Sequence, residues 1–164
     1  MASELHEFLS HDHDRLDLLL SGCLGADGSV EADMFAEFRE GLLRHIGIEE
    51  KVLFPELRKR KGVTLLEEQL HTDHAALAAL LVPPPGPSEI EQIRTILTLH
   101  NPLEERDGGL YEILEDLAGH QLAELMGRVH AIPRVRVAPH TESETIRKAI
   151  DQLVRRSLES RKLT

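Results

Sequence analysis

A nine-residue pattern, D-H-x-x-L-x-x-L-L, occurs twice in this chain, and each copy is followed by H-x-x-x-E-E. The first copy spans residues 12–20 and its continuation residues 45–50. The second copy spans residues 73–81, and its continuation residues 100–105. Four histidines and two carboxylates are thereby placed on four segments in a repeating order. This is the layout of a two-metal site inside a four-helix bundle.

The spacing of apolar residues predicts helices along most of the chain, and no segment alternates long enough to indicate a strand. The start and stop signals give four long helices, over about residues 3–22, 29–60, 64–82 and 88–119. We expect Pro55 to kink or end the second helix, and Pro102 with the pair Gly108-Gly109 to distort the fourth. The sequence therefore predicts an all-α protein, an antiparallel up-down four-helix bundle with an internal pseudo-two-fold repeat.

The last part of the chain differs in charge from the rest. Residues 1–127 hold 10 Lys and Arg against 25 Asp and Glu, whereas residues 128–164 hold 9 against 4. A short helix near 120–131, an extended strap over 132–140 and an amphipathic helix after Thr141 are expected there. We predict a metal-binding bundle over 1–127, and a basic strap and helix over 128–164. The basic module should dock on the bundle or form a homodimer without supplying metal ligands.

Composition excludes several classes of function. A net charge of −10 argues against nucleic acid as a partner. The single cysteine, Cys23, excludes an internal disulfide and a cysteine-based zinc or iron–sulfur site within one chain. No apolar run approaches the ~20 residues of a membrane span, and the N-terminus lacks the features of a signal peptide. We therefore expect a cytoplasmic protein that does not bind membranes.

Neighbouring residues on each helix indicate which histidines face the core. Four of them have leucine, isoleucine or valine at helical spacing on either side: His13, His45, His74 and His100. Glu49 and Glu104 each follow one of these histidines by four residues, so they share its buried face. His11 has charged residues at the same offsets and should face water. His71 lies three residues before His74, and the sequence leaves open whether it is a fifth ligand or supports a ligand.

Burying four imidazoles and two carboxylates without compensation costs several kcal/mol per charged group. Two divalent cations would remove that cost, although a purely polar network in the core is an alternative. Imidazole and carboxylate suit iron, manganese, zinc or copper, so the donor types alone do not select the metal.

These motifs resemble the hemerythrin-like, or HHE cation-binding, family. The resemblance covers about residues 5–117 and rests on four segments: Asp12-His13, His45-x-x-x-Glu49-Glu50 with Leu53-Phe54-Pro55, Asp73-His74, and His100-x-x-x-Glu104-Glu105 with Leu110-Tyr111. It implies a four-helix bundle with a non-haem di-iron centre. In that centre the four histidines would be terminal ligands, while Glu49 and Glu104 would bridge two iron ions about 3.5–4 Å apart, together with an oxo or hydroxo group.

Two positions depart from the oxygen-carrying hemerythrins. Those proteins have His-x-x-x-His on the third helix, where this chain has Leu70 at the first position, and His-x-x-x-x-Asp on the fourth, where it has His-x-x-x-Glu. Four histidines and two glutamates are more similar to the branch that includes iron–sulfur repair proteins. The cysteine-containing N-terminal domain of those proteins is not present in this sequence.

Several functions are compatible with such a centre. The first hypothesis is a binding protein for O2, NO or peroxide, used in sensing, scavenging or storage. The alternatives are an iron-handling protein that delivers iron for iron–sulfur centre repair, a di-iron enzyme that reduces peroxide or NO, and an interaction module with structural metal. No motif of another enzyme class is present, and no catalytic residue is assigned.

Overall fold

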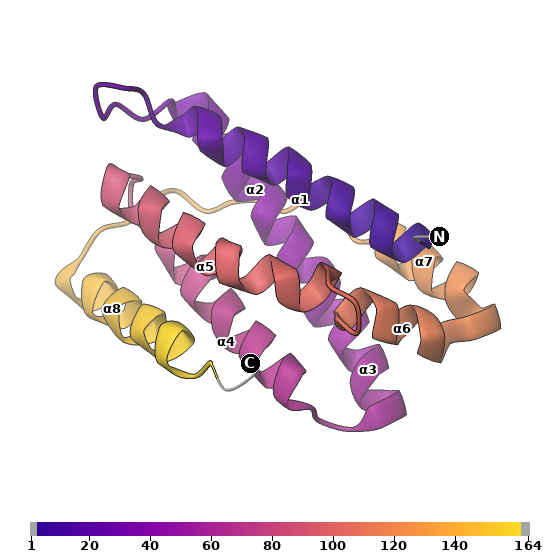
Figure 1. Ribbon diagram of the computed structural model, residues 1–164. Coiled ribbons are helices and arrows are strands. Elements are labelled where there is room, and N and C mark those ends of the chain that lie inside the picture. The colour runs from indigo at the N-terminus through magenta and orange to yellow at the C-terminus, as the bar shows by residue number, and fades with distance from the viewer. Residues whose placement is uncertain (1–2, 162–164) are drawn as a thin grey trace.

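The computed structural model describes residues 3–161, which form a bundle of helices (Figure 1). In chain order the elements are α1 (Glu4–Cys23), α2 (Ala32–Ile48), η1 (Glu49–Leu53), α3 (Phe54–Lys61), α4 (Leu65–Leu80), α5 (Pro87–Glu105), α6 (Leu110–Ala118), η2 (Gly119–Gln121), α7 (Leu122–His130) and α8 (Glu144–Glu159). No strand occurs between residues 3 and 161, where a single isolated bridge joins Leu24 and Val30.

The four long helices are α1, α2 with its continuation, α4, and α5 with α6. Helix α1 packs against α2 and α5, and α4 packs against α5. The predicted all-α four-helix bundle is thereby confirmed. Within the described residues, no helix is both long enough and apolar enough to cross a membrane.

The second long helix runs to Lys61 without the break expected at Pro55. Residues Glu49–Leu53 form a π-helical turn in which the Phe54 N–H donates to the Glu49 carbonyl, five residues back. Pro55 then occupies the start of α3, where a missing N–H is tolerated. The wider turn therefore lets the helix pass the proline, and it places Glu49 within an irregular segment of the kind that often occurs at functional sites.

The fourth long helix, expected to run to about Gly119, is interrupted. Helix α5 continues through Pro102 and ends at Glu105, and α6 begins at Leu110. Gly108 has a φ of 73°, which glycine adopts at low cost. A Cβ on Gly109 would lie 2.6 Å from the Glu104 carbonyl oxygen, so only glycine fits there. The glycine pair thus makes a turn rather than a distortion.

Several helix caps also differ from the expected ones by two residues. Thr64 caps α4 as predicted, accepting a hydrogen bond from the Glu67 N–H. Ser29 instead donates to Asp27 within a turn, and α2 begins at Ala32. The fourth long helix begins at Pro87, with the Glu89 carboxylate accepting from the Gly86 N–H. The last helix is capped by Ser143 instead of Thr141.

The apolar core has two parts with a polar layer between them. One cluster is built around Leu5, Leu9, Phe54 and Leu114, and the other around Leu16, Leu20, Phe38 and Ile93. On α1, His13 lies between Leu9 of the first cluster and Leu16 of the second. The same change from one cluster to the other occurs on each long helix within three residues of its histidine. The histidines and glutamates therefore form a layer across the middle of the bundle.

The chain after α7 returns along the bundle as an extended segment (Figure 1). It follows α2, where the Arg44 guanidinium donates to the Ile132 carbonyl at 3.0 Å, and ends near the α4–α5 turn, where the Thr141 N–H donates to the Val82 carbonyl. Helix α8 then packs along α4 of the same chain and buries Ile150. The extended segment and α8 thus lie against the bundle of their own chain.

Candidate metal centre

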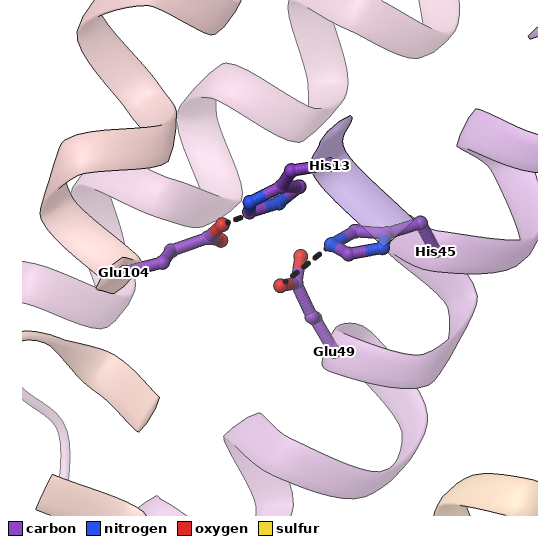
Figure 2. A group of neighbouring side chains, drawn as sticks. All are labelled: His13, His45, Glu49 and Glu104. Atoms are coloured by element: carbon purple, nitrogen blue, oxygen red, sulfur yellow. Dashed lines mark ion pairs between the residues drawn. The ribbon is translucent and has the colours of Figure 1, made fainter. Parts of the chain in front are cut away.

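Six buried side chains from the four long helices meet in the polar layer. They are the six that the sequence singles out: His13, His45, Glu49, His74, His100 and Glu104, none more than 6% exposed. They form two groups, and within each group the donor atoms lie within 4.8 Å of one another. His13 and His45 complete one group (Figure 2), while His74 and His100 complete the other. Glu49 and Glu104 belong to both groups.

The Nε2 atoms of the histidines all face the two shared carboxylates. His45 Nε2 lies 3.2 Å from Glu49 Oε1, and His74 Nε2 lies 3.0 Å from Glu49 Oε2. On the other carboxylate, His13 Nε2 lies 3.2 Å from Glu104 Oε2, and His100 Nε2 lies 3.0 Å from Glu104 Oε1. Each glutamate therefore directs one oxygen to each group, which is the arrangement of a bridging carboxylate.

The Nδ1 atoms of the same histidines are held by a second set of carboxylates. Asp12 Oδ2 lies 2.8 Å from His45 Nδ1, and Glu50 Oε1 lies 2.8 Å from His74 Nδ1. In the same way, Asp73 pairs with His100 at 3.1 Å, and Glu105 pairs with His13. Because each carboxylate fixes its imidazole with Nε2 facing inward, the four pairs have the form of carboxylate–histidine–metal triads.

The sequence pattern contained these outer carboxylates without revealing their roles. They are the Asp of each D-H pair and the second Glu of each E-E pair. Successive residues on a helix point about 100° apart, so each carboxylate serves a histidine of the adjacent helix instead of its own neighbour. The pairs thus run around the bundle, from α1 to α2, from η1 to α4, from α4 to α5 and from α5 back to α1.

Tyr111, on α6, is a further polar residue of the layer that the sequence left without a role. Its hydroxyl donates to Glu49 Oε1 at 2.9 Å or to Glu104 Oε2 at 3.1 Å, and it lies 3.3 Å from His13 Nε2. The side chain is fully buried. Burial and the charges of both glutamates raise the pKa of Tyr111 well above 10, so the phenol keeps its proton and remains a donor.

The remaining histidines lie outside the two groups. His71, left open as a fifth ligand, is 67% exposed and hydrogen-bonds to Glu50 at 2.9 Å. It therefore touches the carboxylate that orients His74, as expected for a supporting residue. His11 is exposed as predicted, and His120 and His130 are exposed as well.

Unsatisfied polar atoms show that the layer fits cations. Among residues 3–161, the buried atoms Glu49 Oε2, Glu104 Oε1 and His74 Nε2 make no hydrogen bond, although each lies 3.0 Å from a facing atom of the layer. A buried polar atom without a partner costs about 1–3 kcal/mol, and more when it is charged. Cations between the imidazoles and carboxylates would satisfy all three atoms, because each atom belongs to one of the two groups of nitrogen and oxygen donors.

Protons are the competitors of such cations. Burial opposes the protonation of His45 and His100, but the negative charges of Glu49 and Glu104 beside them raise both pKa values to about 10. Burial likewise disfavours the charged form of Glu49, yet the neighbouring histidines hold its pKa well below the usual value. Since metal ligation needs neutral imidazoles, binding of a cation must displace protons from these sites.

A cavity of about 220 Å³ reaches this layer from the side of the bundle. His13, His45 and His100 line its inner end, leucines including Leu16 and Leu20 line its wall, and Arg94 and Thr98 lie toward the surface. A small molecule can therefore approach the centre along an apolar path.

The bundle and its layer of donors define a protein that can hold metal ions between four helices. The chain matches the family model described as the hemerythrin HHE cation binding domain over residues 4–124. It belongs to this family, and the predicted resemblance is confirmed. No curated protein and no solved structure matches the chain. Helix α8 and the strap lie outside the matched residues.

Proposed function

We propose that this chain is a non-haem di-iron protein that binds O2, NO or peroxide at its metal centre. The observation that carries the proposal is the sharing of Glu49 and Glu104 between two groups of donors, which suits two bridged ions better than one. In this proposal His13 and His45 bind one ion, and His74 and His100 bind the other. Iron is the metal favoured by membership of the family together with the nitrogen and oxygen donors.

The protein side chains would leave room for a ligand. Two histidines and two shared carboxylates supply four protein donors to each ion, fewer than the six of an octahedral site. Two iron ions would supply the electrons for reversible binding or reduction of the ligand. Leucines line the wall of the cavity, and Tyr111 holds a proton on its hydroxyl between the two carboxylates.

Burial of the donors favours a resident centre over delivery of iron to another protein. All six candidate ligands are at most 6% exposed, and four carboxylates fix the histidines from outside. Iron that is cargo must leave readily, which requires ligands that can turn toward solvent. We therefore place ligand binding, for sensing, scavenging or storage, ahead of iron delivery.

The test is an optical titration of the reduced, iron-loaded protein with O2, peroxide or NO. We expect a spectral change that reverses when the gas is removed, or on re-reduction after peroxide. His11→Ala, an exposed neighbour, should behave as wild type, and His13→Ala should lose the change. Loss of iron to a mild chelator on oxidation, without a ligand spectrum, would contradict the proposal and favour delivery. Sustained turnover of peroxide or NO would identify an enzyme.

A further inference from the structure

Helix α8, which lies outside the family match, ends beside the candidate metal centre. Ser157 on this helix is fully buried, and its hydroxyl donates to Asp73 Oδ1 at 2.7 Å. The guanidinium of Arg161, two residues beyond the end of α8, donates to the same oxygen at 3.0 Å. Gln69 on α4 also donates to it at 3.0 Å. One carboxylate oxygen of Asp73 is thus held mainly from the C-terminal segment.

The other carboxylate oxygen of Asp73 contacts a histidine of the candidate metal centre. Asp73 Oδ2 accepts from His100 Nδ1 at 3.1 Å, and His100 Nε2 faces Glu104 Oε1 at 3.0 Å. A continuous chain of contacts therefore runs from α8 through Asp73 and His100 to a shared carboxylate.

Asp73 differs from the other three outer carboxylates in its access to water. The side chains of Asp12, Glu50 and Glu105 are 16%, 27% and 34% exposed, whereas that of Asp73 is 0% exposed. Asp12 is further paired with Arg15 of its own helix. A buried carboxylate must find its hydrogen bonds within the protein, and for Asp73 two of the four come from Ser157 on α8 and from Arg161 beyond it.

We propose that α8 is a functional part of the metal centre, with Ser157 and Arg161 as positioning residues that hold Asp73 and, through it, His100. Binding of the ion between His74 and His100 then depends on the docking of α8, while binding of the ion between His13 and His45 does not. This inference rests on the proposed di-iron function. Within the described residues, Asp73 of the second repeat is contacted by α8 and Arg161, whereas Asp12 of the first repeat is contacted by no such segment. The two repeats are therefore unequal in this proposal.

The expected size of the effect follows from the behaviour of groups that orient metal ligands. Loss of such a group typically lowers metal affinity about 10–100-fold. Ser157→Ala or Arg161→Ala should therefore weaken one of two iron-binding events by about that factor and leave the other unchanged. Arg155→Ala is the matched control, since Arg155 lies on the same helix, carries the same charge and is exposed.

The experiment is an anaerobic titration of the full-length protein with ferrous iron, fitted to two dissociation constants. We expect Ser157→Ala and Arg161→Ala to raise only one constant, and Ser157→Thr and Arg161→Lys to restore part of the affinity. In an Asp73→Asn background, Ser157→Ala should add little, because both changes act through the same carboxylate. If Ser157→Ala does not fold, Arg161→Ala carries the same comparison.

The possible results distinguish a failure of the proposed role of α8 from a failure of the proposed di-iron function. Two ions bound by Ser157→Ala and Arg161→Ala with wild-type constants would overturn the role of α8 and leave the di-iron centre intact. Equal weakening of both ions, or an additive effect in the Asp73→Asn background, would also overturn it. A wild-type protein that binds no iron would overturn the proposed function itself, and the inference with it.

Discussion

Tyr111 and Phe54 occupy equivalent places in the repeat but have different chemistry. Each follows a leucine after an H-x-x-x-E-E segment. The Phe54 ring stacks on the His74 imidazole, with centroids 5.4 Å apart and an interplanar angle of 13°. The Tyr111 ring lies near His13, and its hydroxyl reaches both shared carboxylates. One half of the centre therefore has a hydrogen-bond donor where the other has an apolar ring.

We expect Tyr111→Phe to destabilise the protein and to perturb the half of the centre that contains His13. A hydrogen bond to a charged group contributes about 1.5–3 kcal/mol, and this hydroxyl reaches two charged oxygens. The free energy of unfolding by denaturant should fall by that amount, and the optical spectrum of the iron-loaded protein should change. An unaltered spectrum together with unaltered stability would show that the hydroxyl does not act on the carboxylates.

The burial of the four candidate ligand histidines could be predicted from the sequence because each lies on the apolar stripe of its own helix. The outer carboxylates could not be assigned partners, since Asp12 meets His45 only after α1 and α2 have packed. The role of the Tyr111 hydroxyl could likewise not be predicted. The turn at Gly108 and Gly109 sets its position, and the sequence suggested only a distorted helix there.

Glu50, the outer carboxylate on η1, offers a further test. Glu50 holds His74 Nδ1 at 2.8 Å and is itself contacted by the exposed His71. Glu50→Gln should lower metal affinity about 10–100-fold, as expected for a group that orients a ligand, whereas His71→Ala should have a much smaller effect. Iron affinities of the two variants check this. Equal losses would mean that His71 belongs to the centre.

Among the helices, the second and the fourth each contain an irregular segment near the metal centre. In the second it is the π-helical turn η1, and in the fourth it is the glycine turn between α5 and α6. The π-helical turn begins at the shared glutamate Glu49, and the glycine turn begins after Glu105, the residue that follows the shared glutamate Glu104. The helical type of these segments could be predicted from apolar spacing, and their starts to within about two residues. The exact form of each irregularity depends on packing against neighbouring helices, which a single sequence does not contain.

The strap and α8 can be tested together by truncation after Ala131. From the sequence we expected the bundle to keep its iron and to change only in stability or association. The contacts of Ser157 and Arg161 with Asp73 revise that expectation. The truncated protein should bind one ion with near wild-type affinity and the other about 10–100-fold more weakly. Retention of both affinities would show that α8 only covers apolar surface; size-exclusion chromatography reports any change in association.

At the scale of the whole molecule, protons and metal ions stabilise the same layer under different conditions. The folded-state pKa of His45 and His100 is about 10, above the unfolded value near 6.5. Protonation of these residues therefore stabilises the metal-free fold fully below pH 6.5, and this contribution is lost as the pH rises toward 10. Metal binding displaces those protons and becomes more favourable over the same range.

We accordingly predict that the stabilisation provided by metal grows with pH. The metal-free protein should lose stability between about pH 6.5 and 9, while the iron-loaded protein should not. At a free ion concentration 100-fold above Kd, the added stability is about 2.7 kcal/mol. Thermal unfolding of both forms across this range measures the difference. A constant difference in melting temperature would contradict the competition between protons and metal.

In the proposed centre, two ions share Glu49 and Glu104 in one buried layer. We would test this arrangement by measuring the number of iron ions bound per chain after anaerobic reconstitution, on wild type, His13→Ala, His74→Ala and the exposed control His11→Ala. We predict about two ions for wild type and for His11→Ala, and about one or none for the other two variants. A single ion or none in wild type, or depletion in His11→Ala equal to that in His13→Ala, would contradict a dinuclear centre built from these residues.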